Sequence, residues 1–307
     1  MRLVFIATGD IALPAFRRIL AHGPRPLALV TQPDKPVGRH LTLTPAAIKT
    51  EALAAHLTVL QPESIGDAAE ALAALEPDII VVMAYGQILR PPVLTLARIA
   101  TINLHASLLP KYRGAACIQA AIDAGDATTG VCSMHLVRQL DAGDVILSMP
   151  LPITAEETGA TLHDRLAHLA ADVLTQTLAQ LADGSAPRTA QDATRASYVS
   201  KLVRSDGRLD WTMPATALER RIRAYDPWPG TYTMTIEGGV EKRLKIYPPT
   251  VVVPHQVLEP GRILWENGRC LVGCGQGALE LMTVQPEGAK RMDAQDYLRG
   301  RKPEAFR

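Results

Sequence analysis

Apolar and polar positions in the first half of the chain alternate between two periods. Continuous apolar runs, typical of strands buried on both faces of a parallel sheet, occur at Leu3–Ala7, Pro26–Thr31, Leu57–Leu60, Asp78–Met83 and Ile99–His105. The amphipathic segments Pro14–His22 and Ala46–Ala55, which lie between the first three of these runs, predict helices. This alternation predicts an α/β fold with a doubly wound, mostly parallel sheet, which binds ligands at the carboxyl ends of its strands.

The period changes in the second half of the chain. Leucines at 162, 166, 169, 174, 178 and 181 predict a long helix over Thr161–Asp183, ended by Gly184 at the C′ position. After the polar segment Ser185–Ala196, short strand signals occur at Thr231–Ile236, Arg243–Tyr247, Gly261–Trp265, Arg269–Val272 and Ala278–Val284. We expect an α/β domain at residues 1–190, a linker at 191–205 and a small β-barrel of the oligonucleotide-binding type (OB-like) at 206–307.

Composition narrows the class of protein. The 307 residues include 47% hydrophobic and 21% charged side chains, as in globular proteins. The amino-terminal run Met1–Ala7 does not read as a signal peptide, and no apolar run is long enough to span a membrane, so we expect a cytoplasmic protein. The four cysteines lack the spacing of a metal site and are expected to be buried or idle thiols.

Charge differs between the two predicted domains. Residues 1–190 carry 14 Lys and Arg against 17 Asp and Glu, whereas residues 191–307 carry 18 against 14. A mildly basic barrel fits a polyanionic partner, although many barrels of that charge bind none.

The densest group of polar residues follows the last apolar strand of the first half. Asn103 and His105 fall on one face of that strand, because side chains alternate with period two. Asp141 follows in the turn LDAGD. Taken singly, each has an ordinary structural explanation, but together an imidazole, an amide and a carboxylate suit acyl transfer. Neither Ser nor Cys occupies a nucleophile-elbow motif, which favours direct transfer to an amine.

Several segments resemble folate-dependent formyltransferases. The segment INLHASLLPKYRGAACIQAAI and the LDAGD turn are similar to motifs of the whole superfamily, whereas RAYDPWPG and QPEGAKRM resemble its methionyl-tRNA formyltransferase branch. The resemblance covers nearly the whole chain. It implies a one-carbon transferase of translation initiation, with a formyl-transfer and folate-binding domain followed by a tRNA-binding barrel.

The resemblance also implies site residues. Asn103, His105 and Asp141 match the catalytic positions. The formyl donor would be 10-formyltetrahydrofolate, used as a co-substrate without a metal, and the acceptor would be initiator methionyl-tRNA. The segments that match the folate-binding positions comprise Ala84, Tyr85, Gly86, Gln87, Ile88 and Leu89, and then Ser107, Leu108, Leu109 and Pro110.

The segment Asp34–Pro45 matches the loop that meets the acceptor end of the tRNA in this family. Candidate tRNA contacts, there and in the second domain, are Lys35, Arg39, Lys201, Arg204, Arg208, Lys290 and Arg291. The chain has His40, Leu41 and Thr42 where the family continues with Gly and lysines, so fewer phosphate contacts are expected there. We expect Trp211 and Trp228 to pack in the core, and the protein to act as a monomer.

Three other functions stay open on the sequence. The nearest is a folate-dependent N-formyltransferase acting on an amino-sugar nucleotide, which would have no reason to carry RAYDPWPG or QPEGAKRM. The others are a formyl-folate hydrolase and a non-catalytic RNA-binding factor.

Two further residues have structural expectations only. Cys117 is expected to be a small buried hydrophobe, and His135 a hydrogen-bonded residue of the sheet.

Overall fold

The computed structural model describes residues 1–37, 41–237, 240–301, 303 and 305–307. Internal contacts divide the chain into two compact units. The first comprises Met1–Gly114, Thr129–Pro152 and His163–Tyr198, and the second Ala115–Thr128, Ile153–Leu162 and Val199–Arg307. The domain boundaries expected at residues 190 and 206 stay a prediction.

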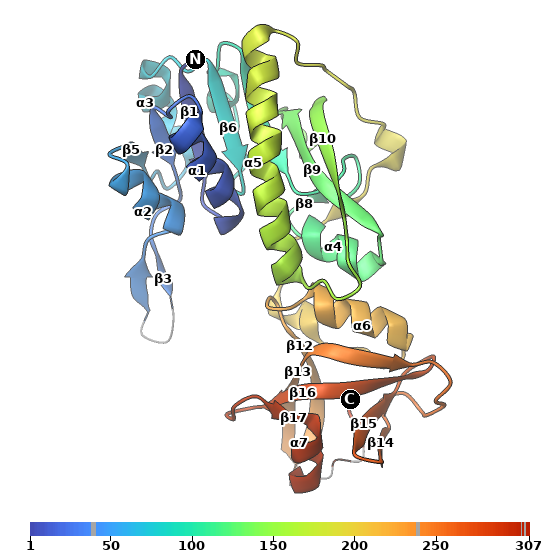
Figure 1. Cartoon of the computed structure of the whole chain (residues 1–307). Helices are drawn as coiled ribbons and strands as arrows, with labels where there is room; N and C mark the ends of the chain where they lie inside the picture. The colour runs from blue at the N-terminus through green and yellow to red at the C-terminus, as the bar shows by residue number, and fades with distance from the viewer. Residues whose placement is uncertain (38–40, 238–239, 302, 304) are drawn as a thin grey trace. The chain divides into compact units, whose positions relative to one another are not determined.

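A seven-stranded sheet forms the centre of the first unit in the described part of the chain (Figure 1). Its strands are β1 (Leu3–Ala7), β2 (Ala28–Val30), β5 (Thr58–Leu60), β6 (Ile79–Met83), β7 (Ala100–His105), β9 (Thr128–His135) and β10 (Val145–Pro152). Their order in the sheet is β10-β9-β7-β6-β1-β2-β5. The five strands from β7 to β5 are parallel, and β9 is antiparallel to β7, which confirms the mostly parallel sheet.

The strand order reverses between β1 and β6. From β1 the chain proceeds through β2 to β5 at one edge, then returns to add β6 and β7 on the other side of β1. In doubly wound sheets, the crevice above such a reversal is where ligands bind.

Helices cover both faces of this sheet. On one face, Phe16 of α1 (Leu13–His22) packs against Phe5 of β1 with ring centroids 5.3 Å apart. The long α5 (Gly159–Asp183) lies on that face too, because Thr177 Oγ1 and Ser133 Oγ of β9 are hydrogen-bonded at 2.6 Å. Gly184 follows α5 with a φ of +76°, as expected at C′.

The opposite face is covered by smaller elements. Its apolar side chains, among them Val4 and Ile6, pack with Ile65 of η2 (Ile65–Ala68) and Leu72 of α3 (Ala69–Ala74). The other elements of the first unit are η1 (Asp10–Ala12), β3 (Lys35–Val37), β4 (Thr42–Thr44), α2 (Ala47–Ala54), η3 (Val93–Thr95), β8 (Arg113–Gly114) and η4 (Ala193–Arg195). A short strand at the boundary between the units, β11 (Tyr198–Val199), pairs with β8.

The second unit contains an antiparallel sheet. Its strands are β12 (Thr231–Glu237), β13 (Val240–Val253), β14 (Ile263–Glu266), β15 (Arg269–Gly273), β16 (Ala278–Pro286) and β17 (Met292–Asp293). The order is β12-β13-β16-β15-β14, with β17 beside β16. The helical elements of the unit are α4 (Cys117–Ala124), η5 (Arg204–Gly207), α6 (Ala215–Ala224) and α7 (Ala294–Arg301). Each of the five predicted strands has a counterpart in this sheet.

One of these strands is much longer than predicted. The expected strand ended at Tyr247, before Pro248 and Pro249, which cannot donate to a ladder. The structure continues β13 to Val253, with a register shift against β16 between Tyr247 and Thr250. A bulge of this kind places the prolines outside the regular hydrogen bonds.

The two tryptophans expected in the core differ. Trp211 is 4% exposed and donates from Nε1 to Thr233 Oγ1 at 2.9 Å, which confirms its packing role. The expectation for Trp228 is wrong, because 48% of this residue is exposed. Trp228 lies between two prolines in the turn that follows α6, which ends at Ala224.

The thiols are buried as expected. Cys117, Cys132, Cys270 and Cys274 are all buried and outside any disulfide. Burial raises the pKa of Cys270 and of Cys274 to about 12, so both remain protonated at neutral pH. Within the described ranges, no helix is long and apolar enough to cross a membrane.

Candidate active site

The ends of three neighbouring strands converge at the point where the strand order reverses. Val82 of β6 pairs with Asn103 of β7, so the segments that follow these strands leave the sheet at the same edge. After β1, the backbone N–H groups of Thr8 and Gly9 donate to the carbonyl oxygen of Ala84 at 3.3 and 3.0 Å. This carboxyl edge therefore gathers Asn103, His105 and the segment that begins at Ala84.

Asn103 and His105 share a face, as period two predicts. Leu104 between them pairs with Ser133, whose side chain bonds to α5, so Leu104 faces α5. Asn103 and His105 point to the opposite face. His105 is buried and Asn103 is half-buried.

Asp141 reaches His105 because its loop folds back over the sheet. Since β9 is antiparallel to β7, its last residue His135 pairs with Ile102, before His105 in β7. The return requires Gly143, where a Cβ would lie 1.8 Å from the carbonyl oxygen of His135. Asp141 itself has a φ of +47°, a conformation that Asp tolerates better than most residues.

The contacts of the pair show which nitrogen of the imidazole carries a hydrogen. His105 Nε2 lies 2.9 Å from the carbonyl oxygen of Tyr112, which can only accept, so Nε2 carries a hydrogen. His105 Nδ1 lies 3.8 Å from Asp141 Oδ2, and the two side chains are 8% and 10% exposed. Asp141 Oδ2 also accepts from the Gly114 N–H at 2.8 Å. Asp141 Oδ2 therefore lies next to Nδ1, on the other side of the ring from the Tyr112 carbonyl.

The side chain of Asn103 ends in an amide, on the face of β7 that also carries His105. Within the ranges that the structure describes, its side chain makes no hydrogen bond. An amide in a half-buried position at the ligand-binding edge can therefore donate to an oxygen of a bound molecule.

The segment 84–89 forms a braced turn after β6. Ala84 and Gly86 have positive φ values of +47° and +86°, and Gln32 Nε2 donates to the Tyr85 carbonyl at 2.6 Å. The Gln87 amide accepts from the Ile65 N–H at 2.8 Å and donates to the Glu63 carbonyl at 2.9 Å. Tyr85 and Leu89 are buried, whereas Ile88 is 63% exposed. This turn offers backbone groups and apolar surface, while the Gln87 side chain serves as a brace.

The segment 107–110 is a second fixed turn at the same edge. Ser107 is fully buried, and its hydroxyl donates to the Lys111 carbonyl at 2.7 Å. The Leu109 N–H points to Cys132 Sγ at 3.4 Å, and burial raises the pKa of that thiol. Leu108, Leu109 and Pro110 are half-buried, so this turn presents an apolar wall.

The candidate RNA contacts lie on both units. Lys35 is exposed on the hairpin of β3 and β4, whereas the candidate Arg39 and its neighbour His40 lie outside the described residues. In the second unit, the exposed cations of the sequence prediction are Lys201, Arg204, Arg208, Lys290 and Arg291. None of these five belongs to the unit that holds His105.

The sequence analysis named Arg291 but missed two basic residues near it in the sheet, Arg243 and Lys245. Arg243 lies 4.1 Å above the Tyr232 ring, and Arg291 lies 3.7 Å above the Tyr247 ring. On β13, Arg243, Lys245 and Tyr247 alternate with the buried Leu244 and Ile246, a strand signal in which the outward positions hold the chemistry. We call Tyr232, Arg243, Lys245, Tyr247 and Arg291 the aromatic–basic face.

His135 differs from its expectation. The prediction of a hydrogen-bonded histidine is wrong for one ring nitrogen, because the buried Nε2 has no hydrogen-bond partner among the described residues. Burial, with a smaller contribution from Arg188, lowers the pKa of His135. The ring is therefore neutral at physiological pH and lies apart from the pairing of Asp141 with His105.

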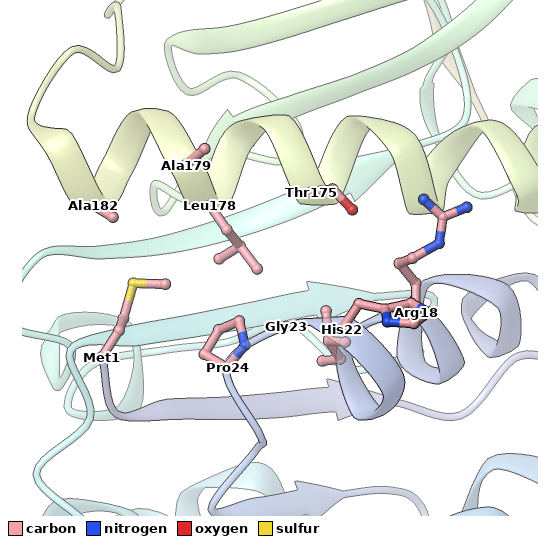
Figure 2. A pocket seen from close by; sticks show the side chains of 10 residues that line it. Met1, Arg18, His22, Gly23, Pro24, Thr175, Leu178, Ala179 and Ala182 are labelled. Carbon is pink, nitrogen blue, oxygen red and sulfur yellow. The ribbon is translucent and has the colours of Figure 1, made fainter.

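A surface groove of about 250 Å³ lies elsewhere on the first unit (Figure 2). Side chains from the end of α1, such as His22, and from α5, such as Leu178, line it beside Met1. Because Met1 precedes β1, the groove lies at the amino ends of the parallel strands, away from the edge that holds His105. Among the described residues, no group of three or more His, Cys, Asp or Glu side chains could hold a metal ion.

The fold and the residues of this edge match a known family. The formyl transferase family matches residues 2–178, and its C-terminal domain matches residues 201–302. The chain belongs to the formyl transferase family, whose reaction is the transfer of a one-carbon group. A methionyl-tRNA formyltransferase of Akkermansia muciniphila is 49% identical over 305 residues, which cover 98% of this chain and 96% of that protein. A methionyl-tRNA formyltransferase of Methylococcus capsulatus is 44% identical, with 97% and 96% covered.

Solved structures share the fold at low identity. An N-formyltransferase from Helicobacter canadensis, in complex with folinic acid and dTDP-3-aminofucose, has a TM-score of 0.67 at 15% identity and covers 95% of this chain and 100% of that one. HypX from Aquifex aeolicus in complex with tetrahydrofolic acid has a TM-score of 0.61 at 16% identity and covers 97% and 47%.

Proposed function

We propose that this chain transfers the formyl group of 10-formyltetrahydrofolate to the α-amino group of methionine on initiator methionyl-tRNA. The observation that carries the reaction type is the His105–Asp141 pair, with the Asn103 amide on the same strand face making no hydrogen bond to any residue that the structure describes. The choice of acceptor is supported by relatives called methionyl-tRNA formyltransferases, which are 42–49% identical over nearly the full length.

The residues suggest how the transfer proceeds. The lone pair of the neutral amine attacks the formyl carbon, and the formyl oxygen gains negative charge in the transition state. The charged His105 ring and the Asn103 amide stabilise that oxygen. The bond from the formyl carbon to N10 of the folate then breaks, the amine loses a proton and N10 gains one. Asp141 orients His105 and assists this proton movement.

The acceptor explains why a strong base is not needed. An α-amino group has a reference pKa of about 7.7–8.0, so a substantial fraction is neutral near pH 7.5. The main demand on the protein is to place the amine against the formyl carbon and to stabilise the oxygen.

The folate would bind at the carboxyl edge. The backbone of residues 84–89 can pair with the polar edge of the pterin, and the wall formed by Leu108, Leu109 and Pro110 can cover its ring. Tyr85 and Ser107 are buried and serve to hold the two turns.

The RNA partner is supported by the aromatic–basic face. Exposed cations bind phosphates, and aromatic rings offer surfaces for unpaired bases. Trp228 is 48% exposed on the same unit and offers a further aromatic ring for an unpaired base. Lys201, Arg204, Arg208 and Lys290 add positive charge on the same unit, and Lys35 adds it on the first unit. Arg39 stays a candidate from the sequence, outside the described residues.

The experiment is a formylation assay with three acceptors. The enzyme and 10-formyltetrahydrofolate are mixed with methionyl initiator tRNA, free methionine or an amino-sugar nucleotide, and the products are followed by mass. We expect product on the charged tRNA alone, lost with His105→Ala. Product on the amino-sugar nucleotide instead would contradict the proposed acceptor but keep the reaction type. Formate released without an acceptor would point to a hydrolase.

The setting of the reaction follows from its acceptor. Initiator tRNA is charged and used in the cytoplasm, so we propose that the enzyme acts there. Because one chain supplies Asn103, His105 and Asp141, we propose a monomer. Light scattering in solution tests this, and a stable dimer would contradict it.

A further inference from the structure

The segment 189–198, which we call the strap, contacts the loop that carries Asp141 and also the backbone at residues 112–113 that holds His105. At its start, Thr189 and Val145 exchange backbone hydrogen bonds of 2.9 and 3.0 Å beside the loop that carries Asp141. At its end, Tyr198 belongs to β11, which pairs with β8. The sequence analysis assigned most of this segment to a linker and expected no site residue in it.

Gln191 is the strap residue that contacts the Asp141 loop. Its Nε2 donates to the carbonyl oxygens of Asp141 and Gly143 at 2.9 and 2.8 Å. Its Oε1 accepts from Arg113 Nε and Nη2 at 3.1 and 2.8 Å. Because a guanidinium only donates, Arg113 fixes the orientation of the amide and directs both Nε2 hydrogens to the loop.

Arg113 connects Gln191 to both members of the pair. It is 2% exposed, and its Nη1 donates to the Tyr198 hydroxyl at 2.9 Å. The preceding residue, Tyr112, supplies the carbonyl that accepts from His105 Nε2. The following residue, Gly114, supplies the N–H that donates to Asp141 Oδ2.

A second strap residue holds the same backbone. The Ser197 hydroxyl accepts from the Tyr112 N–H at 2.9 Å, and its carbonyl accepts from the Arg113 N–H at 2.8 Å. The strap therefore determines the positions of the groups that hold His105 and Asp141.

We propose that Gln191 is a positioning residue for formyl transfer, acting through Asp141. Its amide binds the Asp141 and Gly143 carbonyls on one side and Arg113 on the other. These contacts hold the loop in place and keep the Asp141 carboxylate beside His105. This role rests on the proposed function, since it assumes that the charged His105 ring takes part in the transfer. A displacement of about 1 Å in a catalytic group lowers a rate by about 100-fold, so such a brace has a measurable effect.

The first test is the kinetics of Gln191→Leu, which keeps a side chain of similar size and removes the hydrogen bonds to Arg113 and to the two loop carbonyls. We expect kcat to fall about 10- to 100-fold, while KM for the folate and for the tRNA stays within about twofold. We also expect the decline of kcat on the alkaline side to begin at lower pH, because the charged ring loses its fixed carboxylate. The matched control, Gln176→Leu, removes an exposed glutamine of α5. A Gln191→Leu enzyme with wild-type kcat and pH profile would overturn the proposal.

A second variant distinguishes the contacts with Arg113 from the contacts with the loop carbonyls. It also provides a test if Gln191→Leu does not fold. Gln191→Glu keeps the acceptor for Arg113 but points a carboxylate oxygen at the two loop carbonyls. We expect it to fold and to lose kcat as Gln191→Leu does. Wild-type kcat in a folded Gln191→Glu protein would also overturn the proposal.

A third measurement does not depend on the acceptor. The His105 ring is titrated by nitrogen NMR, with its signal assigned from His105→Ala. In Gln191→Leu, or in Gln191→Glu if the former does not fold, we expect the titration midpoint of His105 to fall relative to the wild type. An unchanged midpoint would refute the positioning role. A lowered midpoint in an enzyme that does not formylate methionyl-tRNA would support positioning and reject only the proposed function.

Discussion

The carboxyl edge of the seven-stranded sheet and the aromatic–basic face of the second unit differ in how their functional side chains are held. At the edge, His105 and Asp141 are almost fully buried and each is held by named backbone groups. On the face, Arg243, Lys245 and Arg291 are exposed. Stabilising a transition-state charge requires a few groups fixed in advance, whereas binding a phosphate backbone requires positive charge along a path. Changes at the edge should therefore affect kcat, and changes on the face should affect RNA affinity.

The largest expected effect is that of Asn103→Ala. Removing one donor to the transition-state oxygen costs about 10²–10³ in kcat, with little change in KM. Steady-state formylation of methionyl-tRNA measures it. Asn267→Gly, in the turn between β14 and β15, is the control and should keep wild-type kcat. A change in KM with wild-type kcat would show that Asn103 does not stabilise the transition state.

The next effect is that of Trp228→Ala on RNA binding. A lost stacking contact costs about 1–3 kcal/mol, or about 5- to 150-fold in Kd for the tRNA, while kcat at saturating tRNA is unchanged. Filter binding measures Kd. Trp265→Ala removes another half-exposed tryptophan, on β14, and should leave Kd unchanged. Equal Kd values for both variants and the wild type would show that Trp228 does not contact RNA.

Replacing cations on the face should change the salt dependence of binding. In Arg243→Gln with Lys245→Gln, the slope of log Kd against log salt should decrease by about one for each lost phosphate contact. Titrations at several salt concentrations measure it. Arg269→Gln is the control, because Arg269 on β15 is paired with Glu280. An unchanged slope in the double variant would place the RNA elsewhere.

The smallest effect concerns stability away from both regions. Because burial lowers the pKa of His135 below its usual value of about 6.5, the unfolded chain binds this proton more readily than the folded one. The contribution of His135 to the free energy of unfolding is therefore greatest above about pH 6.5, and it decreases as the pH falls below that value. In His135→Leu, the Tm should fall less between pH 7 and pH 5.5. His255→Gln, an exposed histidine, should behave as the wild type, and the same fall in Tm for all three proteins would contradict the account.

The sequence predicted best what depends on local periodicity. Buried strands, the face shared by Asn103 and His105, and the end of α5 at Gly184 all follow from side-chain alternation or from a single backbone requirement. The position of Asp141 against His105 does not, because it depends on a loop that folds back through Gly143. Gln191 gave no signal, since a glutamine in a polar run looks the same whether it faces solvent or braces a loop. The prediction for Trp228 was wrong because residue type alone does not decide whether a tryptophan ring in a turn is buried or exposed.

The most direct test of the separation between chemistry and RNA binding is Asp141→Asn. The variant keeps the size of the side chain and removes the charge beside His105. Its single-turnover rate of formyl transfer at saturating methionyl-tRNA, and its Kd for that tRNA, are measured side by side. The account predicts that the rate falls at least about 100-fold while Kd stays within about twofold of the wild type. A weakened Kd with an intact rate at saturation would contradict it.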